Sequence, residues 1–433
     1  MAFILIALFM IPKIDISDYN YNLPDDRIAK FPLEERDNSK LLLYDCVELG
    51  ASSQIDTVNF ASISEILPQN SLMFFNNTKV VPARLFFKRD TGAIIEVFCL
   101  EPDSPSDYQL NFASTESCRW KVIVGNIKRF KSDRIKLLIS SDTLSNKGDF
   151  DHINKLKEID LQAQLISREG NSAIVEFTWQ GGYSFSTVLE LCGKIPIPPY
   201  LKRETQEIDY QRYQTLYAKI RGSVAAPTAG LHFTDKVLED IELKGIKREN
   251  VCLHVGAGTF LPVKSQFIEE HKMHTEPFSV SLSMLKRLFD ALSCGESVIS
   301  VGTTSTRTLE SLYFIGVHCM ETGVPSAVQQ WEPYREEGYS YTPAQSISAI
   351  IKYMEDNDLE ELISRTGIII IPGYDFKIID YLVTNFHQPQ STLLLLISAF
   401  VGEDNWKRIY NYALDNDFRF LSYGDSSLLK RSR

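Results

Sequence analysis

Four loops rich in glycine, hydroxyl and histidine residues carry the side chains of this sequence that are best suited to chemistry. In the first, at residues 222–233, Thr228 and His232 stand among small residues that let a ligand approach the backbone closely. His232 precedes a predicted helix, so it is either a proton carrier or a capping residue. A tight crossover between two domains is the alternative interpretation of the whole loop.

The second loop, at residues 253–260, follows a predicted strand with a Gly-x-Gly turn at Gly256 and Gly258, between His254 and Thr259. Any sharp turn between a strand and a helix can use this pattern. A leucine replaces the third glycine of the dinucleotide-binding fingerprint, so we exclude NAD as a ligand. A histidine inside a strand is more often a core residue than a catalytic one, which leaves both interpretations open for His254.

The third loop, at residues 301–308, places four consecutive hydroxyl side chains between a strand and a helix. Gly302, Thr303 and Thr304 open that helix, where main-chain N–H groups and the helix dipole favour an anion. Arg307 in the first turn offers a planar fork for a carboxylate or phosphate. The alternative is a helix cap with more hydroxyl groups than it needs. The absence of Gly-Lys-Ser/Thr excludes a P-loop.

The fourth loop, at residues 380–391, contains Asp380, Asn385 and His387 ahead of a helix that Ser391 is expected to cap. A loop histidine beside an amide is better placed for proton transfer than one on a helix face. We therefore predict that His387 takes part in chemistry.

A further polar cluster, at residues 271–276, holds His271, His274 and Glu276. Two histidines three residues apart suit a metal ion, but no cysteine or carboxylate spacing completes such a site. We therefore predict no metal.

The composition limits what these loops can belong to. The 433 residues suffice for two or three domains, and 44% hydrophobic with 23% charged residues is ordinary for a globular protein. A net charge of -11 argues against a general nucleic-acid coat but not against a local basic path. The seven cysteines form no Cys-x-x-Cys pair, which indicates reduced structural thiols.

The apolar N-terminus, residues 1–11, is too short for a membrane span and lacks a basic region or a cleavage site. Met10 is an alternative start, and a weak signal peptide is the rival interpretation. We expect a cytoplasmic protein without a membrane segment.

Alternating strands and helices must position the loops. The expected strands lie at residues 41–44, 72–75, 251–255, 298–301 and 368–371, and the helices at 235–243, 284–292 and 393–400. A sheet of this kind binds ligands beyond the carboxyl ends of its strands.

Between residues 93 and 179, five short strand-like runs follow one another without a helical period, which indicates a small barrel or sandwich. Residues 321–366 are polar and predict a surface elaboration with one helix near 346–357. The predicted organisation is an α/β catalytic domain of residues 12–84 and 182–433, with an inserted domain of residues 85–181.

Eight motifs in a fixed order make the pattern specific. They lie at residues 77–85, 224–233, 253–260, 271–276, 302–311, 372–374, 384–392 and 419–425. Together they resemble the S-adenosylmethionine:tRNA ribosyltransferase-isomerase family of queuosine biosynthesis, from about Ile16 to Leu429. The resemblance implies an α/β main domain with an inserted small β-barrel domain.

The resemblance also implies a reaction. The ribosyl group of S-adenosylmethionine moves to 7-aminomethyl-7-deazaguanine at the tRNA wobble position and is isomerised, giving epoxyqueuosine-tRNA, adenine and methionine. The sulfonium acidifies the attached 5′ carbon, so one base can begin the rearrangement, and adenine must be protonated or hydrogen-bonded as it leaves. Histidines suit these transfers. No cofactor is expected, since S-adenosylmethionine is a consumed substrate, and a monomer is expected.

Roles for individual residues follow as hypotheses. Proton transfer falls to His232, His274 and His387, with Asp380 or Glu276 orienting one of them. Thr303, Thr304 and Arg307 would hold the methionine carboxylate, Tyr423 would face the sulfonium or stack on a base, and Asp425 would contact an amine. The other expected substrate-binding residues are Thr228, His254, Gly256, Gly258, Thr259, Gly302 and Asn385.

A tRNA substrate must meet positive charge. Lys79, Arg84, Lys202 and Arg203 flank the predicted domain junction and are the expected tRNA-binding residues, with solvated surface charge as the alternative for each. A steep loss of affinity with salt would follow from such contacts.

The sequence departs from the family pattern at two places. Gln388 and Gln390 differ from the family's usual residues, so the loop holding His387 is expected to differ in shape. The segment of residues 321–366 is longer than in many relatives. A methyltransferase is the rival enzyme, but the order of its glycine-rich turn and acidic residue is not seen. A non-catalytic RNA-binding paralogue is the rival from another class.

Overall fold

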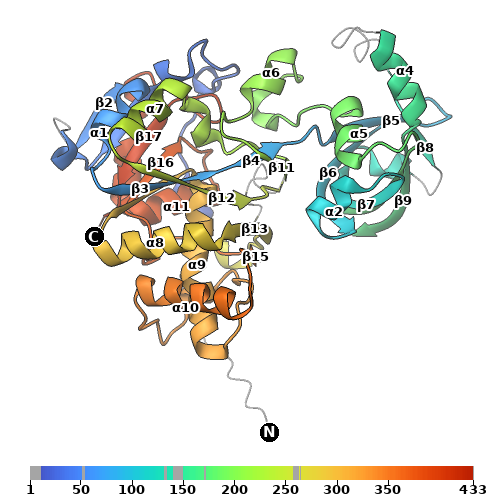
Figure 1. Cartoon of the computed structure of the whole chain (residues 1–433). Coiled ribbons are helices and arrows are strands. Elements are labelled where there is room, and N and C mark those ends of the chain that lie inside the picture. Colours follow the sequence, from blue (N-terminus) through green and yellow to red (C-terminus); the bar gives the residue numbers. More distant parts are fainter. Residues whose placement is uncertain are drawn as a thin grey trace.

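The computed structural model describes residues 11–50, 54–130, 134–139, 150–169, 172–256, 263 and 265–432. A nine-stranded sheet with helices on both faces forms the larger part, and a closed six-stranded barrel lies to one side of it (Figure 1). The predicted fold class, an α/β main domain with a small inserted β-barrel, is confirmed. No helix among the described residues has the length and apolar character to cross a bilayer.

The strand order of the large sheet is β15-β13-β12-β3-β14-β16-β17-β1-β2. Its strands are β1 (Lys40–Tyr44), β2 (Ile55–Asn59), β3 (Ser71–Asn76), β12 (Lys247–Leu253), β13 (Glu276–Ser281), β14 (Ser297–Val301), β15 (Glu361–Thr366), β16 (Tyr381–Asn385) and β17 (Ser426–Lys430). Strands β12, β3, β14 and β16 run parallel, whereas β17 is antiparallel to β16 and begins where β16 ends. One edge therefore collects the ends of four strands and the start of β17.

Alternate residues of the central strands feed two cores. Leu72 and Phe74 of β3 face one layer of helices, and Met73 and Phe75 face the other, as the two-residue period of a strand requires. The first layer contains α8 (Leu282–Cys294), α9 (Thr303–Thr322), α10 (Pro343–Asp356), α11 (Thr392–Val401) and α12 (Glu403–Asp415). The second contains α1 (Ile63–Ile66) and α7 (Asp235–Leu243), so the sheet is covered on both faces.

The barrel closes in the order β10-β7-β6-β5-β8-β9. Its strands are β5 (Arg84–Lys88), β6 (Ile94–Ser104), β7 (Ser117–Val124), β8 (Ile135–Leu137), β9 (Gln162–Glu169) and β10 (Ser172–Thr178), with helices α2 (Tyr108–Ala113), α4 (Phe150–Ile159) and α5 (Phe185–Cys192) beside it. Trp120 and Phe177 fill its core, and Phe185 of α5 packs against both rings. The barrel core thus continues past residue 181 into α5, while the predicted division of the chain at 84/85 and 181/182 stays a prediction.

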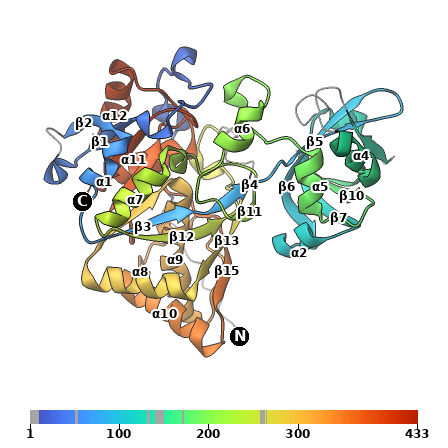
Figure 2. The ribbon, with the colours of Figure 1, turned by 45° about the horizontal axis from the view of Figure 1, so that its top comes forward.

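Two short parallel strands and one helix connect the two parts. They are β4 (Thr78–Val80), β11 (Ile220–Ser223) and α6 (Glu207–Arg212), and both views place them between sheet and barrel (Figures 1 and 2). Tyr108 of α2 stacks on His254, which follows β12, at a centroid distance of 4.3 Å. These connections bring the barrel next to the edge where the parallel strands end.

Two details of the sequence prediction are wrong. Residues 368–371 are buried but form no strand, and the neighbouring strand is β15, which lies inside the segment expected to be a surface elaboration. The apolar run at residues 368–371 indicates that these residues are buried, but a buried segment need not be a strand. The barrel also has a sixth strand, β5, in the stretch just ahead of the five runs that the sequence suggested.

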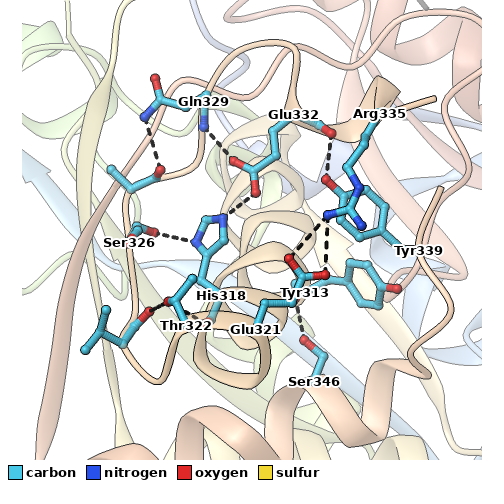
Figure 3. Close-up of polar contacts among 12 residues, drawn as sticks. Tyr313, His318, Glu321, Thr322, Ser326, Gln329, Glu332, Arg335, Tyr339 and Ser346 are labelled. Atoms are coloured by element: carbon cyan, nitrogen blue, oxygen red, sulfur yellow. Dashed lines mark hydrogen bonds and ion pairs between the residues drawn. The ribbon is translucent and has the colours of Figure 1, made fainter. Parts of the chain in front are cut away.

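The segment that follows α9 folds back on that helix. His318 Nδ1 lies 3.2 Å from the carbonyl oxygen of Ser326, and its Nε2 faces the carboxylate of Glu332 (Figure 3). Arg335 pairs with Glu321 at 3.2 Å, and the Tyr339 hydroxyl donates to the Glu332 carbonyl at 2.7 Å (Figure 3). The elaboration is therefore an ordered part of the main domain.

Candidate active site

A cleft opens at the edge where the parallel strands end. It encloses about 830 Å³ of empty volume, including the part open to solvent. Its lining comes from stretches that are far apart in the sequence, contributing Tyr200, Tyr213, Ala225–Ala229, Val255, Gly302–Thr304, Thr384–Gln388, Ser391, Leu393, Leu421 and Ser422. Three of the four predicted loops supply most of it, and the second loop supplies Val255.

Sheet topology explains this convergence. β14 ends at Val301 and β16 at Asn385, and because β17 starts opposite the end of β16, the chain just before β17 reaches the same place. Gly302 takes φ 87°, a conformation that costs a side chain-bearing residue energy, and a Cβ added there would contact Ala229 at 3.6 Å. The tight turn brings the start of α9 directly to the cleft.

The N-terminus of α9 faces the cleft without a side-chain cap. Gly302 is its N-cap and no side chain bonds there, so the first main-chain N–H groups have no partner within the helix. Thr303 and Thr304 line the cleft beside them. The next two hydroxyls point back into the helix, with Ser305 donating to Val301 O at 2.9 Å and Thr306 to Gly302 O at 3.2 Å. Both interpretations of the hydroxyl run therefore hold, each for a different pair of residues.

Arg307 does not line the cleft. Its guanidinium pairs with the buried carboxylate of Glu276, and its Nε donates to Ile368 O at 3.2 Å. Glu276 in turn accepts from the main-chain nitrogen of Gly256 at 3.2 Å. This pair ties α9 to the loop after β12, so Arg307 and Glu276 hold the site together from behind, and the structure does not place either of them against a ligand.

His387 is the histidine that lines the cleft. Its Nε2 lies 3.1 Å from the Thr384 hydroxyl, and the Tyr410 hydroxyl accepts from its main-chain nitrogen at 3.0 Å. Burial lowers the pKa of the ring to about 4, so it is neutral at pH 7. A neutral imidazole in a cleft can accept a proton from a bound substrate.

His232 is buried between two fixed partners. Nδ1 lies 2.8 Å from the Ser39 hydroxyl and Nε2 lies 3.2 Å from Asn385 Oδ1, while Asn385 Nδ2 donates to Leu421 O at 2.9 Å. An amide oxygen can only accept, so the proton of the neutral ring sits on Nε2 and Ser39 donates to Nδ1. Burial lowers the pKa of His232 to about 4. His232 does not cap α7, because Thr234 does so, and its contacts suit a structural pin that fixes Asn385.

The two predicted ligand contacts at the end of the chain face inward. The Tyr423 hydroxyl donates to Asp209 at 2.8 Å, and Asp425 accepts from the main-chain nitrogens of Lys40 at 3.0 Å and Arg419 at 2.7 Å. Both residues shape the turn that presents Ser422 to the cleft. Neither lines the cleft.

Asp380 and His274 also lie away from the cleft. Asp380 precedes β16 and accepts from the main-chain nitrogen of Val298 at 3.1 Å, at the opposite edge of the sheet from His387. The side chain of His274 is exposed. The structure therefore removes Asp380 as an orienting partner for His387, because a residue before a parallel strand lies at the other end of it from a residue after the strand.

The second loop is described only in part. His254 is stacked on Tyr108, and burial lowers the pKa of its ring to about 4. Gly258 and Thr259 lie outside the described residues. Within the described chain, no group of three histidine, cysteine or acidic residues is arranged to hold a metal ion.

Of the expected tRNA-binding residues, three are paired with a carboxylate of the protein. Arg203 donates to both oxygens of Asp209 at 2.7 Å and is largely buried, and Arg84 pairs with Glu96. Lys202 bonds to Asp25 at 2.7 Å but is exposed. Lys79 lies on β4, between the two parts of the molecule. Lys202 is exposed and Lys79 is partly exposed, so these two remain the candidates for an RNA contact.

Sequence reasoning missed three residues of the lining. Tyr200 and Ser422 share a hydrogen bond of 2.5 Å, and Tyr213 is fully buried with a hydroxyl that has no hydrogen-bond partner. Ser422 and the backbone of Ala226 lie near that hydroxyl without completing a bond. The signal was available, because Tyr200 ends a proline-rich extended segment and Tyr213 directly follows α6, both ahead of the first loop.

The chain resembles known proteins over nearly its whole length. The family described as queuosine biosynthesis protein matches residues 16–429. The S-adenosylmethionine:tRNA ribosyltransferase-isomerase of Treponema denticola is 36% identical over 412 residues, covering 95% of this chain and 99% of its own. That of Caldanaerobacter subterraneus subsp. tengcongensis is 35% identical over 415 residues, covering 95% and 99%. The crystal structure of S-adenosylmethionine tRNA ribosyltransferase from Thermotoga maritima is 26% identical, covers 95% of this chain and 100% of that one, and gives a TM-score of 0.45.

Proposed function

The chain belongs to the queuosine biosynthesis protein family, and from that premise we propose that it is an S-adenosylmethionine:tRNA ribosyltransferase-isomerase. It transfers the ribosyl group of S-adenosylmethionine to the aminomethyl group of 7-aminomethyl-7-deazaguanine in tRNA and isomerises it. The products are epoxyqueuosine-tRNA, adenine and methionine. The observation that carries the proposal is one cleft in which an uncapped helix N-terminus and a neutral histidine face the same space.

The start of α9 is suited to the methionine end of the substrate. Its unpartnered N–H groups and positive dipole end stabilise a carboxylate, and the Thr303 and Thr304 hydroxyls lie beside them. Arg307, bound to Glu276, contributes to this site by fixing the helix. Tyr200 and Tyr213 form aromatic walls of the same cleft, and an aromatic face attracts a sulfonium cation.

His387 is the group in the cleft that can move a proton. The 5′ carbon next to the sulfonium loses a proton to begin the rearrangement, and the glycosidic C–N bond to adenine breaks with its electron pair passing to the base. Adenine then takes up a proton, so a residue that accepts one proton and returns it satisfies both events. A ring that is neutral at pH 7 is in the right state for the first event. The C–S bond breaks with its electron pair passing to the sulfur, which releases methionine, and the amine loses a proton as a new C–N bond joins it to the sugar.

The surroundings of the reaction are part of the same proposal. S-adenosylmethionine is consumed as a substrate, and we propose that no resident cofactor or metal takes part. One chain supplies the whole described cleft, which supports a monomer as the working unit. A tRNA-modifying role places the protein in the cytoplasm.

The function is tested by product analysis. The protein is incubated with S-adenosylmethionine and tRNA that carries 7-aminomethyl-7-deazaguanine, and adenine, methionine and the modified nucleoside are quantified by mass spectrometry. We expect one adenine and one methionine per epoxyqueuosine. S-adenosylhomocysteine as the product would identify a methyltransferase, and tRNA binding without either product would identify a non-catalytic paralogue.

A further inference from the structure

Three arginines gather at one end of the cleft, beside His232. They are Arg36, Arg212 and Arg419, and none of them forms an ion pair with a carboxylate within the described part of the chain. Their hydrogen bonds run to main-chain carbonyl groups instead. Arg36 donates to Gln214 O at 2.8 Å, Arg212 to Glu34 O at 2.9 Å, and Arg419 to Phe31 O at 2.8 Å.

These bonds interlock two segments but leave the charges uncompensated. Arg36 belongs to the N-terminal segment and reaches the end of α6, while Arg212 belongs to the end of α6 and reaches back. Carbonyl oxygens satisfy donors, yet they carry no net charge. The Nε of Arg212 is buried with no partner at all. A guanidinium has five donors, so unused donors remain on each side chain.

The electrostatics point the same way. Burial and the neighbouring Arg212 lower the pKa of Arg36, and burial lowers the pKa of Arg419 although Asp425 opposes it. Asp425 is itself bonded to two main-chain nitrogens. Partly buried like charges that lack an ion-paired carboxylate are costly, and an anion placed among them relieves that cost.

A small pocket adjoins these side chains. It has about 300 Å³ of empty volume, including the part open to solvent. Arg36 and Arg212 line it, whereas Arg419 does not, and the other lining residues are Pro32, Leu33, Ser39, Leu231, His232, Ser422, Tyr423 and Gly424. Ser422 also lines the main cleft, so the two spaces adjoin at this residue. We call this space the arginine pocket.

We infer that the arginine pocket binds a backbone phosphate of the RNA substrate, next to the nucleotide whose base enters the main cleft. The inference rests on the proposed function, since an RNA carries a phosphate beside every reacting nucleotide. A phosphate offers several acceptor oxygens to converging guanidinium donors, whereas the methionine carboxylate is already served by the start of α9.

The test compares kinetics of the full chain with three substitutions. Arg212→Gln removes the charge, Arg212→Lys keeps it, and Arg431→Gln is the matched control, because Arg431 also donates to a main-chain carbonyl, Phe376 O, but at the opposite edge of the sheet. We expect Arg212→Gln to raise the KM for tRNA about 10-fold or more, with the KM for S-adenosylmethionine within 2-fold. The salt dependence of tRNA binding, measured without S-adenosylmethionine, should lose roughly one unit of slope. Arg212→Lys should recover part of the affinity, and Arg431→Gln should change neither constant.

A substituted RNA makes the test independent of folding. In an RNA with a neutral methylphosphonate beside the modified nucleotide, wild type and Arg212→Gln should bind equally, because the contact is already gone. If Arg212→Gln weakens both RNAs alike, or raises the KM for S-adenosylmethionine alone, the phosphate assignment is wrong. Wild-type product formation is measured first, so an inactive wild type refutes the proposed function, while an active wild type with an unaffected Arg212→Gln variant refutes the pocket alone.

Discussion

At the carboxyl edge of the sheet, the residues that follow β14 and β16 face a cleft, whereas at the amino edge of the same strands the charged side chains are bonded to other parts of the chain. His387 and the start of α9 lie at the first edge. At the second, Asp380 accepts from Val298, Arg431 donates to Phe376 O, and Lys430 pairs with Glu48. Polar residues are frequent at both edges, so their abundance does not mark the site; unused hydrogen-bonding capacity does.

The largest expected effect is on the rate of adenine release, compared between a variant of a histidine at the carboxyl edge and a variant of an acidic residue at the amino edge. His387→Gln should lower the rate of adenine release by about 10²- to 10⁴-fold, the usual contribution of a positioned acid or base. Asp380→Asn should leave the rate within 2-fold, because an amide oxygen still accepts from Val298 N. Both rates are measured at saturating S-adenosylmethionine and tRNA.

Two outcomes would contradict the expected difference between the two edges. A His387→Gln variant with full turnover would place the proton transfer elsewhere, and a slow Asp380→Asn variant would show that the amino edge communicates with the chemistry. Circular dichroism at 222 nm of both variants separates lost catalysis from lost folding.

The second prediction sharpens the comparison within the carboxyl edge. Tyr213 and Tyr217 both have buried hydroxyls without a hydrogen-bond partner, but Tyr213 lines the cleft and Tyr217 packs against Phe75 in the core. Tyr213→Phe should raise the KM for one of the substrates about 10-fold, as expected when a buried hydroxyl meets a ligand. Tyr217→Phe should leave kcat and KM unchanged.

Thermal unfolding provides the control for this pair. Removing a buried hydroxyl without a partner costs no hydrogen bond, so neither variant should melt below the wild type. Equal kinetics for the two variants would mean that the Tyr213 hydroxyl meets no substrate.

How far the sequence predicts the site depends on the kind of information needed. Gly302, Thr303 and His387 could be predicted to line the cleft because a run of small, hydroxyl or histidine residues within one loop is a local pattern of the sequence. Asp380 was misplaced because residues 380–391 were interpreted as one loop, whereas residues 381–385 form β16, which Asp380 precedes and His387 follows. With parallel strands, that order alone assigns it to the other edge.

Other features required the tertiary structure. Tyr423 and Asp425 follow α12 in a motif typical of the family, but their partners Asp209 and Lys40 are far away in the sequence. No spacing rule connects such residues. The fold class was predictable because period and length are local properties, whereas the orientation of a side chain toward the cleft or away from it is set by packing.

The smallest expected effect concerns pH and stability. Burial lowers the pKa of His232, His254 and His387 from 6.5 to about 4. Between pH 6.5 and 4 the unfolded chain therefore binds protons that the folded chain does not, so the free energy of unfolding falls as the pH falls. Each histidine contributes at most about 1.4 kcal/mol per pH unit in this window. Urea unfolding at pH 5 and pH 7 measures this pH dependence. The variant His254→Gln should lower the number of protons taken up on unfolding by up to one, so its free energy of unfolding should change less between the two pH values.

His318 provides the opposite sign in the same assay. Its ring faces the Glu332 carboxylate and the Ser326 carbonyl, both acceptors, and its pKa is raised (Figure 3). Its stabilisation is complete below pH 6.5 and is lost as the pH rises through the raised value. His318→Gln should therefore destabilise the protein at pH 6 and less so at alkaline pH. In contrast, the His254→Gln variant should lose less stability than the wild type as the pH falls. If both variants changed stability with the same sign of pH dependence, the contrast between a histidine buried as a neutral ring and one held as a cation would be wrong.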